Sequence, residues 1–382
     1  MACTLTFRFM MKFKISYIHI AFLFCLLCLS RTSFSQSDLV PNNNSVLPAT
    51  ALKPYGRSLI DNQQNLALIS SAVHFGFGFT GKGCTIYASI NDADGHNYLQ
   101  YELDGVYQKR IKITGGAVQQ IVLTTNAEGP HTVWMYKATE ATTGPVYIEK
   151  ITGNDLSIID PSNAPLIEFI GNSITCGAAA DASEIACGQG VYQDQHNAYY
   201  AYGPRVARAL NLNFILSSVS GIGIYRTWNM DGLSMPQAYE KESFQLNDTL
   251  LWNFTTYTPK IVSITLGTND LSHGDGIHPR KPFDSAIFVK DYISFVQLVK
   301  SKYPKAIIAL LSSPMINGSD RILLQNCLTA VKRKIDVLYP ADKAIALFFF
   351  QPMQAHGCSD HPSVEDHAIL AQELIPFFKG LL

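Results

Sequence analysis

Apolar and polar positions alternate in short runs from residue 54 to about residue 160. Turn sequences rich in glycine, asparagine and aspartate separate these runs, which is the pattern of β-strands with one buried face. Eight strands are predicted, at 65–73, 75–79, 84–90, 98–103, 110–114, 118–124, 131–137 and 146–151. Because no part of this region has a helical period, we expect an all-β sandwich or jelly roll over residues 54–160.

The pattern changes after residue 160. Short runs that are apolar along most of their length alternate with longer amphipathic segments, as strands alternate with helices. The predicted strands are 166–170, 213–217, 261–266, 306–311 and 344–350, and the predicted helices are 197–210, 285–303, 321–339 and 364–381. Strands without an alternation of apolar and polar positions are buried on both faces. Residues 161–382 are therefore predicted to form a doubly wound parallel sheet, an α/β/α sandwich.

The N-terminal segment has a third pattern. Basic residues precede an apolar run at 18–29, and small residues follow near position 35, which is typical of a secretion signal. We assign residues 1–36 to a signal peptide and 37–53 to a polar linker, so the protein is expected to be secreted, periplasmic or at the cell surface. An uncleaved anchor is the alternative, but the apolar run is short for a membrane span, and no stable membrane association is expected after cleavage.

Charge and cysteine content narrow the choice of function. The formal net charge of the 382 residues is −1 and no basic run is present, so nucleic acid is not an expected partner. Five cysteines lie outside the predicted signal peptide, an odd number that cannot all pair; they are Cys84, Cys176, Cys187, Cys327 and Cys358. A bridge between Cys176 and Cys187 is possible in an oxidising compartment, although spacing alone does not establish it.

A candidate nucleophile follows the first strand of the second domain. The apolar run 166–170 breaks at Gly171-Asn172 and delivers Ser173 to the carboxyl end of the strand, the edge at which ligands bind in open α/β sheets. Glycine permits the tight exit, and the backbone N–H groups after it are free to face a developing negative charge. Taken alone, a serine after Gly-Asn is more often a turn or N-cap residue.

Two further strand ends carry possible hydrogen-bond donors. The strand at 213–217 runs into Gly221 and Gly223, where the absence of a Cβ lets a backbone N–H approach a substrate. The strand at 261–266 runs into Asn269 and Asp270. An asparagine amide can donate to an oxyanion and the aspartate can hold the loop, so we assign these roles to Asn269 and Asp270.

A candidate base lies before the last predicted helix. Ser363 and Asp366 form a capping box that fixes the start of this helix and holds His361 just before it. An imidazole that titrates near neutrality can accept the proton of Ser173 and pass it to a leaving alcohol.

These four blocks, PLIEFIGNSITCG, SSVSGIG, LGTND and DHPS, together resemble those of the SGNH (GDSL-like) hydrolases. The resemblance implies an active site of Ser173, Gly221, Asn269 and His361, with an oxyanion hole formed by Ser173, Gly221 and Asn269 and with Gly223 as the alternative glycine. The family commonly has an aspartate three residues before the histidine, where this chain has Cys358, or two before it, where the chain has Ser359.

Asp360 is the nearest carboxylate to His361. Because neighbouring residues rarely point the same way, Asp360 is a weak third catalytic member. We expect a Ser173–His361 dyad whose ring is oriented by a backbone carbonyl or another acceptor.

The first domain carries a second resemblance. Gly56-Arg57, the run 97–105, the run 129–137 with Thr139-Glu140, and Gly144-Pro145 are similar to the N-terminal jelly roll of family 2 carbohydrate esterases. Aromatic residues of this domain, namely Tyr87, Tyr98, Tyr101 and Trp134, either bind carbohydrate or belong to its core.

The resemblance implies a secreted serine esterase that removes O-acetyl groups from a xylan-like or glucomannan-like polysaccharide through an acyl-enzyme, without a cofactor. The alternatives are an esterase or lipase for other small acyl esters and a noncatalytic glycan-binding protein. A metal-dependent hydrolase is a further class, because potential ligands gather near the C-terminus: His356, Cys358, Asp360, His361 and His367. Their spacing matches no common zinc pattern, so no metal is expected.

Overall fold

The computed structural model describes residues 45–160, 162–230 and 232–382. The predicted signal peptide and residues 37–44 of the predicted linker lie outside the described residues, whereas residues 46–48 of that linker form a strand of the first domain. The predicted limits of the two domains, 54–160 and 161–382, stay predictions. Within the described residues, no helix combines the length and apolar character needed to cross a bilayer.

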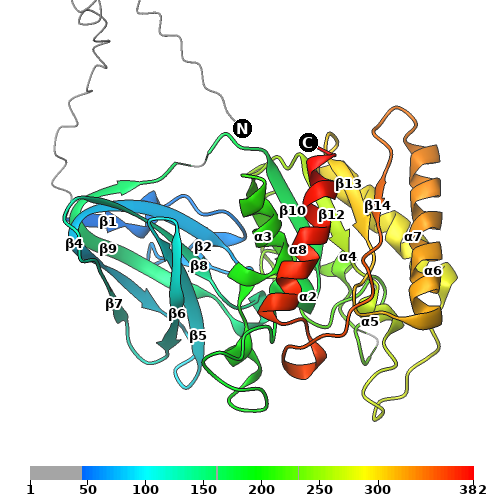
Figure 1. The fold of residues 1–382 in the computed structure, drawn as a ribbon, viewed down its shortest axis with the longest axis horizontal. Helices are drawn as coiled ribbons and strands as arrows, with labels where there is room; N and C mark the ends of the chain where they lie inside the picture. The colour runs from blue at the N-terminus through cyan, green and yellow to red at the C-terminus, as the bar shows by residue number, and fades with distance from the viewer. Residues whose placement is uncertain (1–44, 161, 231) are drawn as a thin grey trace, which may run out of the picture. The chain divides into compact units, whose positions relative to one another are not determined.

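The first domain is a nine-stranded antiparallel assembly (Figure 1). Its strands are β1 (Val46–Pro48), β2 (Ser58–Ile60), β3 (Leu66–Leu68), β4 (His74–Ser89), β5 (His96–Leu103), β6 (Val106–Thr114), β7 (Gln119–Thr124), β8 (Pro130–Lys137) and β9 (Val146–Ile158). They follow the order β2-β3-β9-β4-β8-β5-β6, with β1 added to β9 and β7 added to β4. Inward-facing residues such as Phe75, Phe77 and Ile86 form the core, and the predicted all-β domain is confirmed.

The strand β4 differs from the prediction. The Gly-Lys-Gly sequence at 81–83 was expected to be a turn between two strands, but the chain stays in one strand. The pairing of β4 with β9 shifts in register between Thr80 and Cys84, and Gly81 has a φ of +93°. The glycine is therefore used to bend a continuous strand, as in a β-bulge, and not to reverse the chain.

The second domain is built on a five-stranded parallel sheet. Its strands are β10 (Leu166–Gly171), β11 (Asn213–Ser218), β12 (Ile261–Thr265), β13 (Ile307–Leu311) and β14 (Ala346–Phe348), in the order β11-β10-β12-β13-β14. Its helices are α2 (Ser173–Cys176), α3 (Tyr202–Ala209), α4 (Met235–Ala238), α5 (Thr268–Leu271), α6 (Ser285–Lys302), α7 (Gly318–Leu338) and α8 (Val364–Lys379).

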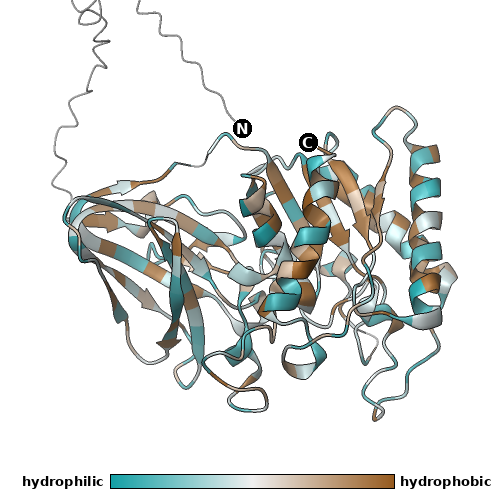
Figure 2. Ribbon diagram, viewed as in Figure 1, coloured by the Kyte–Doolittle hydropathy of each residue, from teal (hydrophilic) through white to brown (hydrophobic). Residues whose placement is uncertain are grey.

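Helices cover both faces of this sheet. The helices α3 and α8 pack on one face, and α4, α6 and α7 pack on the other. The strands β10, β12 and β13 are mostly hydrophobic, as Figure 2 shows, with Glu168, Ser263 and Thr265 as buried polar exceptions. Strands buried on both faces require this composition, and the predicted doubly wound α/β/α fold is confirmed.

Buried polar contacts join the two domains. Arg57, which precedes β2, is 1% exposed and donates to the carbonyl of Tyr239 at 2.7 Å and to that of Lys241. Arg110 of β6 donates to the carbonyls of Asp194 and His196 at 2.7 and 2.9 Å. A buried guanidinium with carbonyl partners fixes both chains that it bridges, so the β domain holds segments of the second domain in place.

The four aromatic residues of the β domain considered for carbohydrate binding differ in burial. Tyr98 and Tyr101 are buried, while Tyr87 and Trp134 are half-buried. The Tyr98 hydroxyl donates to the Asp194 carboxylate at 2.7 Å. Two of the four aromatics considered for carbohydrate binding are therefore structural.

Candidate active site

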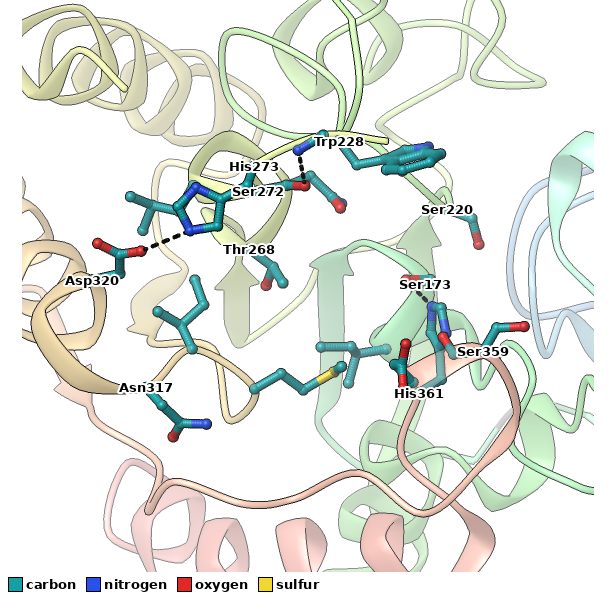
Figure 3. A pocket seen from close by; sticks show the side chains of 18 of the residues that line it. Ser173, Ser220, Trp228, Thr268, Ser272, His273, Asn317, Asp320, Ser359 and His361 are labelled. Carbon is teal, nitrogen blue, oxygen red and sulfur yellow. Dashed lines mark hydrogen bonds and ion pairs between the residues drawn. The ribbon is translucent and has the colours of Figure 1, made fainter. Parts of the chain in front are cut away.

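The candidate residues converge on one cavity at the carboxyl edge of the parallel sheet. Ser173 follows β10, Gly221 follows β11, Asn269 follows β12, and His361 precedes α8. All four line a cavity of about 910 Å³, and Figure 3 shows Ser173 and His361 pointing toward one another on its wall. Parallel strands deliver their carboxyl ends to one edge, which explains how residues so distant in sequence meet.

The turn before Ser173 is fixed by its neighbours. A Cβ at Gly171 would lie 2.0 Å from the Thr175 hydroxyl oxygen, so only glycine fits there. Asn172 caps the short helix α2 by accepting from the Ile174 N–H at 3.1 Å. Ser173 is 8% exposed, and its side chain is thus held at the cavity wall.

Ser173 and His361 form a hydrogen-bonded pair. The Ser173 Oγ lies 2.9 Å from His361 Nε2, and His361 Nδ1 lies 2.7 Å from the carbonyl oxygen of Ser359. A carbonyl oxygen can only accept, so Nδ1 carries the ring proton and Nε2 of the neutral ring accepts from the serine hydroxyl. This is the arrangement in which an imidazole can remove the serine proton.

The loop before His361 has an unusual backbone that explains this geometry. Ser359 and Asp360 have φ values of +50° and +57°. These values lie in the left-handed region, which residues other than glycine rarely adopt. Both residues lie in a 3₁₀ turn, η5 (Cys358–Asp360).

The predicted capping box at the start of α8 is confirmed: Ser363 Oγ accepts from the Asp366 N–H at 3.2 Å, and the Asp366 carboxylate accepts from the Ser363 N–H at 2.9 Å.

The structure does not pair Asp360 with the ring of His361. The Ser359 carbonyl occupies Nδ1 of His361, and the exposed Asp360 carboxylate forms no hydrogen bond or ion pair within the described ranges. Adjacent side chains diverge from an extended or turned backbone, which is the physical reason for this outcome. The ring is oriented by a backbone carbonyl.

Burial sets the protonation of the pair. It lowers the pKa of His361 below its ordinary value, and the nearby His196 acts in the same direction, while the hydrogen bond to the Ser359 carbonyl opposes them. The charged imidazolium is poorly solvated in this position. His361 is therefore neutral, and able to accept a proton, at neutral pH.

Three N–H groups are positioned to serve as an oxyanion site. The backbone N–H groups of Ser173 and Gly221 have no hydrogen-bond acceptor within the described residues. Asn269 donates one amide hydrogen to the Ile222 carbonyl at 2.8 Å, which leaves the second for the cavity. Gly221 has a φ of +75° and lines the cavity, whereas Gly223 does not line it. The geometry favours Gly221 over Gly223.

Asp270 holds the two donor loops together. Its buried carboxylate accepts from the N–H groups of Ile224 and Tyr225 at 2.9 and 3.0 Å. Burial raises the pKa of Asp270 to about 6, against the lowering effect of these hydrogen bonds and of Arg226. A Cβ at Gly223 would lie 2.4 Å from the Asp270 carboxylate, so Gly223 serves this close approach.

The cysteine prediction needs correction. Cys187 is bonded to Cys358 and not to Cys176, which is a free and buried thiol. Cys176 lies on α2 beneath the cavity wall, 3.2 Å from the Ser218 hydroxyl. The disulfide instead ties the loop around residue 187 to η5, directly before the carbonyl that orients His361.

All of the potential metal ligands near the C-terminus except Asp360 are bonded to other groups. Cys358 is in the disulfide, and His356 Nδ1 lies 2.9 Å from the Asp366 carboxylate. His367 is fully buried, which lowers its pKa to about 3. Among the residues that the structure describes, no group of three histidine, cysteine or acidic side chains could hold a metal ion.

The remaining walls of the cavity come from loops. Trp228 lines it and is 43% exposed. Opposite lie Asn317 and Asp320 at the start of α7, with His273 3.7 Å from the Asp320 carboxylate (Figure 3). Sequence reasoning missed Asn317 and Asp320 because no motif marks them and only the fold brings them to the site.

Two family models match the chain. Residues 55–161 match the carbohydrate esterase 2 N-terminal family, and residues 169–341 match the GDSL-like lipase/acylhydrolase family.

Two curated relatives have similar sequences. An acetylxylan esterase/glucomannan deacetylase of Cellvibrio japonicus is 26% identical over 356 residues, which cover 87% of this chain and 93% of the relative. The cellulase/esterase CelE of Acetivibrio thermocellus is 28% identical over 298 residues; the alignment covers 75% of this chain but spans only 34% of CelE.

Solved structures of family two carbohydrate esterases are similar to both domains of this chain. A family two carbohydrate esterase from Clostridium thermocellum in complex with cellohexaose has a TM-score of 0.75 and 25% identity, and the match covers 88% of this chain and 100% of that one. A family two carbohydrate esterase from Cellvibrio japonicus shares the fold, with a TM-score of 0.75 and 22% identity over 88% of this chain and 97% of that one. Both domains of this chain are thus matched together, and these findings support a carbohydrate esterase of the family 2 type with a GDSL-like (SGNH) hydrolase domain.

Proposed function

We propose that this protein is a secreted serine esterase that removes O-acetyl groups from a polysaccharide of the xylan or glucomannan type. The observation that carries the proposal is the pair formed by Ser173 Oγ and His361 Nε2, 2.9 Å apart, beside three N–H donors on the same cavity.

In the first step His361 Nε2 accepts the hydroxyl proton of Ser173 while Oγ attacks the acetyl carbonyl carbon. The carbonyl π electrons move to oxygen, and the N–H groups of Ser173 and Gly221 with the Asn269 amide stabilise that oxyanion. When the tetrahedral intermediate collapses, the bond to the sugar oxygen breaks and His361 returns its proton to that oxygen. The acetyl group is then an ester of Ser173.

In the second step water takes the place of the sugar. His361 accepts a proton from the water, whose oxygen attacks the acetyl-serine carbonyl, and the same three donors stabilise the second oxyanion. Collapse releases acetic acid, which loses its proton to the solvent, and His361 returns its proton to Ser173 Oγ. No cofactor enters either step, since every proton transfer uses His361 and every charge is stabilised by hydrogen bonds.

The substrate class is inferred from the site and from the relatives. The cavity is open at its rim, where Trp228 is 43% exposed, and exposed aromatic rings can pack on sugar rings through their apolar faces. The Cellvibrio japonicus relative is named for acetylxylan and glucomannan. Secretion is inferred from the basic and apolar pattern of residues 1–36, and a periplasmic or cell-surface location is consistent with the same pattern.

The test is acetate release from acetylated xylan and acetylated glucomannan by the purified protein. We expect release to survive EDTA and to fall by at least three decades in Ser173→Ala. Ser301→Ala, the same substitution at an exposed position of α6, is the matched control and should retain full activity. Loss of activity in EDTA would indicate a metal-dependent hydrolase, and activity only on simple esters would indicate an esterase for other small acyl groups.

A further inference from the structure

One carboxylate of the β domain forms a hydrogen bond with a loop that lines the candidate active site. Glu140 follows β8 and is 1% exposed. All three partners of its carboxylate belong to the second domain: the Ser220 N–H at 2.7 Å, His196 Nε2 at 3.5 Å and the Cys176 thiol at 3.7 Å. The mechanism described above uses none of these contacts.

The Ser220 N–H is next in the chain to the oxyanion donor Gly221. The segment is held at three points: the Val219 N–H donates to the Gly171 carbonyl at 3.3 Å, the Ser220 N–H donates to Glu140, and the Gly221 carbonyl accepts from the Trp228 N–H at 2.9 Å. Glycine has the greatest backbone freedom of any residue. Without the central contact, the peptide that carries the Gly221 N–H could rotate away from the cavity.

Glu140 is a strong acceptor in this position. Burial by itself would raise the pKa of Glu140, but the hydrogen bonds from His196 and from the Ser220 N–H hold that pKa below the ordinary value. An ionised carboxylate forms shorter and stronger hydrogen bonds than a neutral acceptor. Lys137 Nζ donates to the Glu140 carbonyl at 2.5 Å, which fixes the backbone from which the side chain extends.

The same cluster continues toward the catalytic histidine. The Tyr192 hydroxyl lies 3.1 Å from the Ser220 hydroxyl. The Tyr192 ring packs edge-on against His196 at 4.6 Å and against His361 at 6.5 Å between ring centroids. Glu140, His196 and Tyr192 thus form a packed group that contacts both Ser220, in the oxyanion loop, and the ring of His361.

We propose that Glu140 is a positioning residue that the β domain supplies to the oxyanion site, so that the β domain completes the active site. The inference rests on the proposed esterase function. It predicts that the position of the Glu140 oxygen, and not the volume of the side chain, controls the rate of acyl transfer.

Two substitutions separate these effects. Glu140→Asp keeps the charge but withdraws the oxygen by about 1.5 Å, beyond hydrogen-bond range of the Ser220 N–H. Glu140→Gln removes the charge but keeps an oxygen acceptor at the same distance from the Ser220 N–H. With 4-nitrophenyl acetate we expect kcat of Glu140→Asp to fall by about 10- to 100-fold with KM within about twofold, because only transition-state stabilisation is lost. Glu140→Gln should remain within about fivefold of the wild type.

Glu102 offers a matched control. It is a buried carboxylate of β5 that also bridges the domains, bonded to the hydroxyls of Tyr199 and, at 3.2 Å, Tyr136. It has no contact with the oxyanion loop within the described residues. Glu102→Asp and Glu102→Gln should lower thermal stability without changing kcat, and a loss of kcat equal to that of Glu140→Asp would overturn the proposal.

A second readout reports on the oxyanion site directly. A small alkyl boronic acid forms a tetrahedral adduct with an active-site serine, so its affinity should fall in Glu140→Asp by the same factor as kcat. Should Glu140→Asp fail to fold, Glu140→Ala is the second variant, with the same expected loss. A folded Glu140→Asp or Glu140→Ala with kcat within threefold of the wild type would overturn the proposal. So would a Glu140→Gln as impaired as Glu140→Asp. A wild-type protein with no esterase activity would instead refute the proposed function.

Discussion

Replacing Asp360 by asparagine tests how the catalytic histidine is oriented. In the structure, Nδ1 of His361 donates to the Ser359 carbonyl at 2.7 Å, while the exposed Asp360 carboxylate forms no hydrogen bond with the ring. Asp360→Asn changes charge and leaves size nearly constant. The substitution therefore removes only what a carboxylate could contribute to the ring.

The two models of the site differ widely in the size of the expected effect. In a triad, changing the carboxylate to an amide lowers kcat by about 10⁴-fold because the histidine takes the wrong tautomer, which corresponds to about 5.4 kcal/mol in the barrier. In the observed geometry Asp360 acts only through its charge. An exposed charge contributes about 1 kcal/mol or less, which is about a fivefold change in rate.

The assay is steady-state hydrolysis of 4-nitrophenyl acetate across pH 5 to 9, with His361→Ala beside Asp360→Asn. We expect Asp360→Asn to keep kcat within about fivefold and His361→Ala to lose at least three decades. A loss in Asp360→Asn of a thousandfold or more, at unchanged thermal stability, would refute the assignment of the Ser359 carbonyl as the orienting group.

Other parts of the site give further predictions. Asn269→Ala should lower kcat by about 10²- to 10³-fold with little change in KM. The reason is that one amide hydrogen of Asn269 is bonded to the Ile222 carbonyl and the other is left for the oxyanion. A loss of kcat below fivefold in steady-state kinetics would remove Asn269 from the oxyanion site. Burial lowers the pKa of His361, and a base acts only when neutral, so the acid limb of kcat/KM should lie below the ordinary imidazole value of about 6.5; a limb above that value contradicts the burial argument. The disulfide between Cys187 and Cys358 joins residues 171 apart in sequence, for which the chain-entropy model gives about 5 kcal/mol. Cys187→Ala should therefore lower the urea midpoint strongly and reduce kcat by loosening η5, and an unchanged midpoint would contradict this account.

The strands and helices of the second domain could be predicted because their pattern is periodic and strong. Apolar runs at 166–170 and 261–266 are short and β-branched, so they become β10 and β12 within one residue of the predicted limits. The predicted break between two strands at residues 81–83 was wrong, because glycine occurs both in turns and in bulges within a continuous strand. Gly81 lies in a sequence that resembles a turn, yet pairing with β9 on both sides keeps the strand intact.

The meeting of the candidate residues at one cavity could be predicted from the sequence, but the contacts that support them could not. Ser173, Gly221, Asn269 and His361 each follow a strand end or precede a helix, where local sequence carries a signal. The orienting group is a backbone carbonyl, which no side-chain motif reveals. Glu140, Asn317 and the partner of Cys187 depend on which loops meet in space, and such long-range pairing leaves no periodic trace in the sequence.

The most direct test of the account is to trap the acyl-enzyme. The purified protein would be mixed with 4-nitrophenyl acetate, quenched in acid within one turnover and digested for peptide mass spectrometry. We predict one added acetyl group on the peptide that contains Ser173, present in the wild type and absent in Ser173→Ala. Rapid turnover with no acetyl group on that peptide, or an acetyl group on another residue whose removal abolishes activity, would contradict the assignment of Ser173 as the nucleophile.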